Sequence, residues 1–307
     1  MPASSLLRRA TVAAIALGLT AVGAGPAHSA PTPDAGPTAG GTVVSDALPG
    51  FAFTEVAAGQ AFSVAIGQDG LLYSWGQDNR GQLGNGAADT TTHTTPAPVA
   101  TPAGLTFTAV AAGSLHALAL GSDGAVYAWG ANTNGQLGDG TLVDASAPVR
   151  VALPAGSTVT ALVAGYTFSG ALLSDGRLLM WGDNSNGQLG SGTFIRSTTP
   201  IPVSMPAGVG VSTISAGSAL AHHMLVIGTD GQTYGWGSNG SGQVGTGAQG
   251  GVEYLPVQVQ TPTGVRFVQV TAGWGHSLAI ADDGTLWSWG NNAAARNRWP
   301  AATSRTC

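Results

Sequence analysis

The dipeptide Trp-Gly recurs five times at nearly equal intervals, and this repeat constrains the fold more than any other feature. Successive tryptophans are 54, 52, 55 and 53 residues apart. They are Trp75, Trp129, Trp181, Trp236 and Trp289. An Asp-Gly pair lies shortly upstream of each tryptophan, beginning at Asp69, Asp123, Asp175, Asp230 and Asp283. A period of this length predicts an array of similar supersecondary units.

Each unit contains the signals for four short antiparallel strands. Asp-Gly between alternating runs predicts a β-hairpin with a two-residue type I′ turn. Ala-Gly ends a short strand-like run before the hairpin, as in Phe53–Val56. After the Trp, Gly-Gln-Leu-Gly or Gly-Gln-Val-Gly leads to a Pro-Val strand in the first four units, as in Gly81–Gly84 and Pro98-Val99.

The units are expected to stack radially. A four-stranded unit of this size cannot bury both faces alone, so a propeller or a solenoid is indicated. In Ala117–Leu120 and Ser277–Ile280, bulky residues alternate with Ala or Ser. This alternation lets neighbouring sheets nest, which favours the propeller.

The order of motifs resembles the repeat of the regulator-of-chromosome-condensation (RCC1-like) family, over about residues 51–292. The second unit carries nearly all of it, in Ala112–Leu120, Asp123-Gly124 and Trp129–Gly138. The resemblance implies an all-β fold, a β-propeller of four-stranded blades, with seven blades in the typical member. Five units are recognisable here.

The fifth unit departs from the repeat at its end. Ala295 occupies the place of the first Gly of Gly-Gln-Leu-Gly, and residues 293–307 form an aberrant tail. We interpret this as a frameshift or a truncation of a seven-bladed ring. The alternative is a five-bladed ring closed by a strand from Thr42–Leu48, within the linker 31–50.

Residues 1–30 predict a signal peptide, and hence a secreted or cell-surface protein. Arg8-Arg9 precedes the uncharged stretch Ala10–Gly25, and Ala27–Ala30 offers small residues for cleavage. The stretch is shorter and weaker than a spanning helix requires. Cys307 is the sole cysteine, which excludes an intrachain disulfide.

Charge and motif content argue against several function classes. Residues 51–292 contain thirteen acidic residues and five arginines, which disfavours nucleic-acid binding. His116, His223 and His276 share a repeat position with Phe62 and Phe168, so they are interpreted as packing residues, and no metal site or cofactor is expected.

Catalytic and nucleotide-binding motifs are also absent. Gly240–Gly245 fits Gly-x-Gly-x-x-Gly but has no helix signal after it, so we interpret it as a variant of the repeat. The Asp-Gly carboxylates lie one per unit, and no nucleophile elbow is found. The chain is therefore predicted not to be an enzyme, and its motifs imply no small-molecule substrate.

The preferred function is a module that binds an extracellular protein or glycan. Alternatives are a surface-repeat scaffold without a discrete ligand, and a binder like the secreted β-lactamase inhibitors of soil bacteria, whose propeller repeat looks similar. Guanine-nucleotide exchange, which the resemblance also suggests, is disfavoured by the export signal and the acidic repeat. The partner is expected on the rim that carries the variable residues Gln60, Leu115, Tyr166, Leu220, His222 and Trp274.

Overall fold

The computed structural model describes residues 52–216, 221–292 and 304–306. Almost all described residues belong to one compact unit, Phe53–Cys307. The predicted signal peptide and linker, and most of the C-terminal tail, lie outside the described residues. None of the described residues belongs to a helix long and apolar enough to cross a bilayer.

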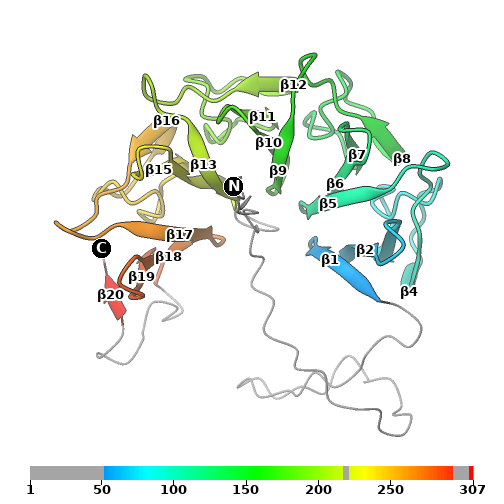
Figure 1. Cartoon of the computed structure of the whole chain (residues 1–307), viewed down its shortest axis with the longest axis horizontal. Helices are drawn as coiled ribbons and strands as arrows, with labels where there is room; N and C mark the ends of the chain where they lie inside the picture. The colour runs from blue at the N-terminus through cyan, green and yellow to red at the C-terminus, as the bar shows by residue number, and fades with distance from the viewer. Residues whose placement is uncertain (1–51, 217–220, 293–303, 307) are drawn as a thin grey trace, which may run out of the picture. The chain divides into compact units, whose positions relative to one another are not determined.

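The compact unit Phe53–Cys307 is built from five four-stranded sheets, one for each sequence repeat. The sheets follow one another in chain order around an arc (Figure 1). The first sheet contains β1 (Phe53–Ala58), β2 (Phe62–Gly67), β3 (Leu72–Gln77) and β4 (Thr92–Pro98). The second contains β5 (Phe107–Ala112), β6 (His116–Gly121), β7 (Val126–Gly130) and β8 (Ala145–Arg150). The third contains β9 (Val159–Ala164), β10 (Phe168–Leu173), β11 (Leu178–Gly182) and β12 (Ser197–Pro202).

The last two sheets differ in their outer strand. The fourth contains β13 (Val211–Ala216), β14 (His223–Gly228), β15 (Thr233–Ser238) and β16 (Val252–Gln258). The fifth contains β17 (Phe267–Ala272), β18 (His276–Ala281), β19 (Leu286–Gly290) and β20 (Ser304–Thr306). The first four sheets are antiparallel throughout, as expected, whereas β20 pairs with β19 in parallel. The proposed closing strand Thr42–Leu48 lies outside the described residues.

The Asp-Gly turns are not the predicted two-residue type I′ turns. Gly67 N donates to Leu71 O, and Gly70 N donates to Gly67 O, so the loop has three residues. Gly70 takes the left-handed conformation, with φ of 77°. Asp69 Oδ1 accepts the N–H of Leu71. This is the three-residue hairpin loop with a type I turn and a bulge at the glycine, in which only one residue needs positive φ.

The hydrophobic core lies between sheets rather than within one. Four clusters of buried side chains each join two consecutive sheets. In the second sheet, Ala117 and Ala119 face the first sheet, while Leu118 faces the third. The predicted alternation of small and bulky faces is therefore confirmed, and each sheet depends on its neighbours for burial.

From the second sheet on, the repeated tryptophan of each sheet donates a hydrogen bond to the loop of the preceding unit. Trp129 Nε1 donates to Gln82 O at 3.0 Å, across the boundary between the first two sheets. The same bond recurs from Trp181 to Gln136, from Trp236 to Gln188 and from Trp289 to Gln243. The second glycine of Gly-Gln-Leu-Gly must be small, because a Cβ on Gly138 would lie 2.6 Å from Trp181 Nε1. The sequence repeat therefore encodes the contacts between units.

The two ends of the arc present apolar faces. Val56 of β1 is 56% exposed, whereas Val110 and Val270, at the equivalent positions, are 8% and 6% exposed. At the other end, Ile280 of β18 is 37% exposed, and its counterpart Ile227 is 6% exposed. These end faces are the ones that other units bury against a neighbouring sheet, so the described residues form a partial propeller.

Candidate binding rim

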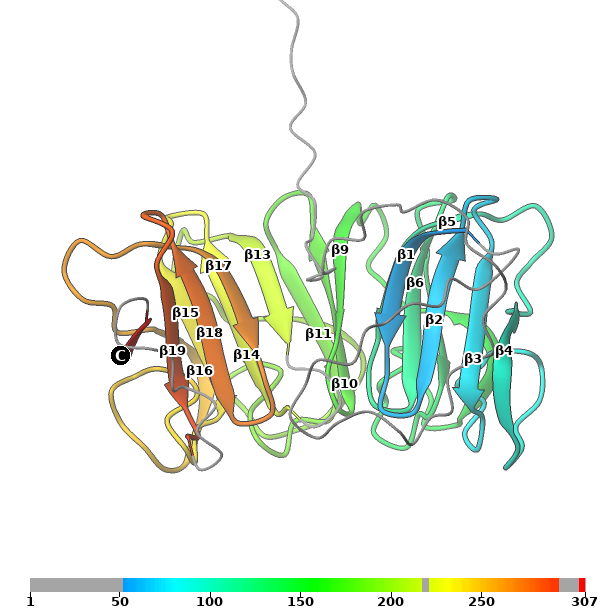
Figure 2. The same ribbon diagram turned by 90° about the horizontal axis from the view of Figure 1, so that it is seen from below.

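The connections between strands lie at two opposite rims, as the alternation of strand directions requires (Figure 2). We call one the loop rim; it contains the described connections that follow the first and third strands of the sheets. The other is the hairpin rim, which contains the Asp-Gly turns. Gln60, Leu115, Tyr166, His222 and Trp274 all lie in connections between first and second strands, hence on the loop rim. Leu220 lies outside the described residues.

Neighbouring sheets are linked along the loop rim by hydrogen bonds between these connections. Gln60 N donates to Ser114 O at 3.0 Å, and Ser114 Oγ donates to Gln60 Oε1 at 2.8 Å. Ser114 N donates to Tyr166 O at 3.3 Å. Ser114 is buried and Leu115 is partly buried. The first three sheets thus share a rim whose backbone is fixed across the unit boundaries.

Two of the predicted residues, Tyr166 and His222, come into direct contact. Their ring centroids are 5.3 Å apart, with the rings at 77° to each other. Tyr166 follows β9 and His222 precedes β14, so the pair joins the third and fourth sheets. Both side chains are partly buried. An edge-to-face contact of this kind holds two amphipathic rings in fixed orientations.

A carboxylate that the sequence analysis did not single out completes this cluster. Asp183 Oδ2 accepts hydrogen bonds from Thr167 Oγ1 at 3.3 Å and from Gln188 Nε2 at 2.9 Å. Burial lowers the pKa of His222 below 6.5, and the nearby Asp183 charge opposes that shift. The equivalent position after Trp-Gly holds no acid in the other units, and this departure was the available signal. Tyr166, Thr167, Asp183 and His222 thus form one polar and aromatic surface.

Trp274 is the most exposed aromatic side chain of the candidate set. It is 59% exposed, in the connection between β17 and β18. The repeated tryptophans of the second to fifth units are almost completely buried by comparison. Gln60 is also exposed, at the first sheet. The loop rim therefore offers exposed aromatic and hydrogen-bonding groups.

At His116 and His223, the shared His/Phe position has the packing role that the sequence indicated. His116 is completely buried, and its Nε2 lies 2.8 Å from Ser169 Oγ of the next sheet. His223 makes the same contact with Ser277 at 3.0 Å. Burial lowers the pKa of His116 to about 4 and contributes most to lowering that of His223 to about 3. These imidazoles are neutral hydrogen-bonding groups between sheets.

A cavity of about 560 Å³ lies beside the Gly-rich loop of the fourth unit. Gly242, Gly245, Gln260 and Trp289 contribute to its lining. The equivalent glycine of the third unit, Gly187, packs closely on β16 of the next sheet. No strand among the described residues of the fifth unit takes that place beside Gly242. The cavity is thus the space that a neighbouring strand fills in the third unit. Among the described residues no helix follows Gly245, as a dinucleotide site would require.

Residues 16–297 match the family model for the RCC1-like domain. The chain belongs to this family. It is 33% identical over 244 residues to the ultraviolet-B receptor UVR8 of Arabidopsis thaliana, a match covering 80% of this chain and 54% of that protein. It is 30% identical to the probable E3 ubiquitin-protein ligase HERC6 of Homo sapiens, over 81% of this chain and 24% of that protein.

Solved structures agree with the family assignment. Yeast RCC1 (Prp20), crystallised with Kap60 bound, superposes with a TM-score of 0.67 at 27% identity. The match covers 79% of this RCC1-like chain and 57% of that one. The chain thus spans about half the length of UVR8 and of yeast RCC1, and the expected all-β propeller of RCC1-like blades is confirmed.

Proposed function

We propose that this RCC1-like chain is a secreted, non-enzymatic module that binds an extracellular protein through its loop rim. The observation that carries the proposal is the grouping of Tyr166, His222 and Asp183 on one rim with the exposed Trp274. Tyr and Trp are enriched among residues that dominate binding energy. Hydrogen bonds join the rim connections of the first three sheets, and Tyr166 packs on His222 of the fourth, so this part of the rim loses little conformational freedom when a partner docks.

A protein partner agrees with what the names and descriptions of the related proteins say about them. The yeast RCC1 structure contains a protein partner, Kap60, and UVR8 is named a receptor. The candidate rim residues are departures from the repeat, where a binding function can be added without disturbing the contacts between sheets. A glycan partner is the alternative, because exposed aromatic rings also stack on sugars.

Secretion is supported by the sequence of residues 1–30, with its two arginines, apolar stretch and small-residue cleavage region. An exported RCC1-like module would meet extracellular proteins and cell-wall polymers. The acidic balance of residues 51–292 favours partners without phosphate backbones.

Substituting the rim aromatics should weaken capture of the partner. The purified protein is used to capture a ligand from secreted proteins and, separately, from cell-wall polysaccharide. We expect Tyr166→Ala and Trp274→Ala each to weaken binding at least tenfold, since truncating a hot-spot aromatic commonly costs about 2 kcal/mol or more. Binding is measured by calorimetry, and folding is checked by thermal unfolding.

Asp175→Ala is the control, because Asp175 lies in a turn of the hairpin rim, where it pairs with Arg177. Its affinity should equal that of the unsubstituted protein. Loss of binding in Asp175→Ala alone would place the site on the hairpin rim and refute the proposal. Capture of polysaccharide alone would replace the protein partner with a glycan.

The protein is also expected not to accelerate nucleotide release from small GTPases. The β3–β4 connection and its equivalents in the next three sheets have almost the same length, so none of them carries an extra insertion that could displace a nucleotide. Release of a fluorescent guanine nucleotide is followed with substoichiometric protein. A rate above the spontaneous one that scales with protein concentration would overturn the proposed binding role.

A further inference from the structure

One position of the repeat, three residues after the repeated Trp, is a buried asparagine in three units. Asn132, Asn184 and Asn239 are each completely buried. Their Oδ1 atoms accept the N–H of the Leu or Val in Gly-Gln-Leu-Gly or Gly-Gln-Val-Gly, at 3.0–3.1 Å. Their Nδ2 atoms donate to the carbonyl oxygen nine residues on, at 2.8–3.3 Å. The asparagine therefore closes the loop by one accepted and one donated bond.

The first unit has Asp78 at this position instead. Asp78 is also completely buried, and its Oδ1 accepts the N–H of Leu83 at 2.9 Å, like the asparagines. Its Oδ2 occupies the place of the amide nitrogen, and this atom has no hydrogen-bond partner. An acceptor thus stands where the other units have a donor. A buried acceptor without a partner costs free energy unless a proton or a cation occupies the space beside it.

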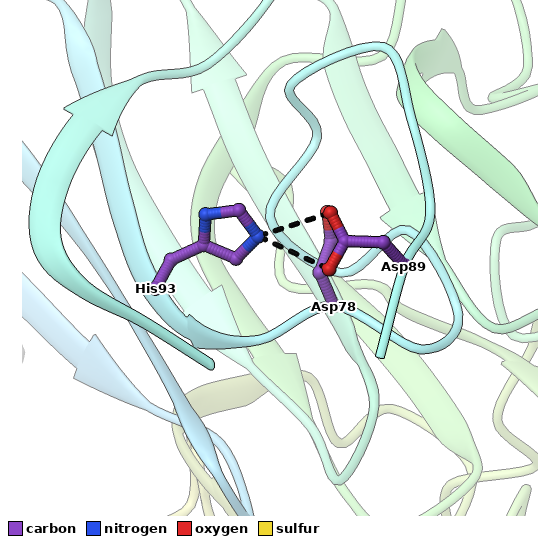
Figure 3. A group of neighbouring side chains, drawn as sticks. All are labelled: Asp78, Asp89 and His93. Carbon is purple, nitrogen blue, oxygen red and sulfur yellow. Dashed lines mark hydrogen bonds and ion pairs between the residues drawn. The ribbon is translucent and has the colours of Figure 1, made fainter. Parts of the chain in front are cut away.

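Asp89 and His93 converge on the same space. One ligand atom from each of Asp78, Asp89 and His93 can be chosen so that all three lie within 4.8 Å of one another (Figure 3). His93 Nε2 is 3.2 Å from Asp89 Oδ2 and 3.3 Å from Asp89 Oδ1. Tetrahedral coordination at zinc distances separates ligand atoms by about 3.4 Å, so small side-chain rotations would suffice.

Backbone bonds hold the three residues in place. Asp89 N donates to Asp78 O at 3.0 Å, and Asp89 Oδ1 accepts the N–H of Thr91 at 2.7 Å. His93 lies on β4, opposite Gly76 of β3. The loop that carries Asp89 is also tied to the second sheet, where Gly86 N donates to Ser146 O at 2.8 Å. The cluster is therefore preorganised by the fold.

The charge balance of the cluster favours a cation. Two carboxylates face one imidazole, and the nearest arginine in sequence, Arg80, pairs at 3.0 Å with Asp144, which directly precedes β8. Burial raises the pKa of Asp78, and the charge of Asp89 raises it further; Leu83 N–H, Asn85 and His93 act in the opposite direction. A bound cation would remove the cost of the buried charge.

We propose that Asp78, Asp89 and His93 bind a divalent transition-metal cation, with Zn²⁺ as its probe. An imidazole nitrogen with two carboxylate oxygens is a ligand set suited to Zn²⁺, whereas Ca²⁺ prefers oxygen ligands alone. Asp89 and His93 are only partly buried, so the cation can enter from solvent. The ion would take over the closure of the β3–β4 loop that asparagine performs in the other units.

The test is titration of chelator-treated, tag-free full chain with Zn²⁺, Mn²⁺ and Ca²⁺ by calorimetry, with thermal unfolding of the same samples. We expect one Zn²⁺ per chain and a Tm raised by several degrees, because a ligand that binds only the native state stabilises it. Asp78→Asn and His93→Gln should each weaken Zn²⁺ binding at least tenfold. Ca²⁺ should bind more weakly than Zn²⁺.

Asp78→Asn separates the metal site from a folding defect, because it restores the residue of the other units. The chelated variant should unfold at the same Tm as the chelated parent or a higher one. Asp139→Asn, in the equivalent loop of the second unit, is the control and should keep the parent's Zn²⁺ affinity.

Two results would overturn the proposal. One is Zn²⁺ binding that Asp78→Asn and His93→Gln leave unchanged, which would put the ion elsewhere. The other is an absence of Zn²⁺ binding by the chelator-treated chain. A Tm difference between the parent and Asp78→Asn that disappears on acidification would then assign the space beside Oδ2 to a proton carried by Asp78.

Discussion

Replacing Trp181 by Ala should lower the free energy of unfolding by about 3–5 kcal/mol. Its indole is completely buried between the second and third sheets, and Nε1 donates to Gln136 O at 2.9 Å. Gly138 packs on the same ring, so truncation leaves a cavity with a rigid wall and a carbonyl deprived of one donor. Urea unfolding followed by far-ultraviolet circular dichroism measures the change.

Trp274→Ala is the matched control, because it makes the same chemical change at a side chain that is 59% exposed. Its effect on the free energy of unfolding should stay within about 0.5 kcal/mol. The loss in free energy of unfolding for Trp75→Ala should lie between those of Trp181→Ala and Trp274→Ala, since Trp75 is only partly buried at the first sheet. Equal stability of Trp181→Ala and Trp274→Ala would refute the role of the repeated tryptophan in packing between sheets.

Much of the fold could be predicted from the sequence because the repeated residues are the ones that make the contacts between units. Trp-Gly and Gly-Gln-Leu-Gly recur together since the indole of one unit bonds the glutamine carbonyl of the unit before it. The alternation of Ala117 and Leu118 correctly indicated two buried faces, one with small side chains and one with bulky side chains. A contact that recurs in every unit leaves a periodic trace, and such traces can be recognised in a single sequence.

The turn type was predicted wrongly because Asp-Gly suits more than one hairpin loop. The side chain of Asp69 accepts the N–H of Leu71, which stabilises a three-residue loop with only Gly70 left-handed. The choice depends on the register of β2 and β3, where Ile66 pairs with Leu72. Register is set by packing on the neighbouring sheets, which the dipeptide alone does not encode.

The candidate site was predicted only in part, for a related reason. Tyr166 and His222 were selected as departures from the repeat, and the structure brings them into contact. Asp183 and the group Asp78, Asp89 and His93 were missed, although Asp78 is visible as the one acid at a position otherwise held by asparagine. Single substitutions within a repeat carry little weight until the partner atoms are known. For Asp78, the informative fact is an unpartnered buried oxygen.

Stability should fall as the pH drops from about 6.5 towards 4, because of the imidazoles buried between sheets. The native pKa values of His116 and His223 are lowered to about 4 and about 3. The unfolded chain binds protons below its histidine pKa of about 6.5, and the native state does not until the lower values are reached. The stabilisation is therefore complete above pH 6.5 and is lost on acidification. For His116 alone the loss approaches about 3 kcal/mol.

Other groups titrate differently across this range. The exposed turn carboxylates Asp69 and Asp175 have pKa values lowered below 3.8, so their contributions are lost only in stronger acid. Asp78 and Glu55 have raised pKa values, which oppose the effect of the histidines near the acidic end of the window. A variant is therefore needed to isolate the imidazole contribution.

The protein itself supplies that variant. His116 faces Ser169 of the next sheet, whereas the equivalent positions at the first boundary hold Phe62 and Ala117. His116→Phe with Ser169→Ala converts the second boundary into a copy of the first, and Trp181 still donates to Gln136 O. Urea unfolding at pH 7.5 and 5 should show a smaller loss of stability for this double variant than for the parent, by about 2 kcal/mol. An identical pH dependence in the two proteins would mean that His116 is protonated in the native state near pH 5, contrary to its burial between sheets.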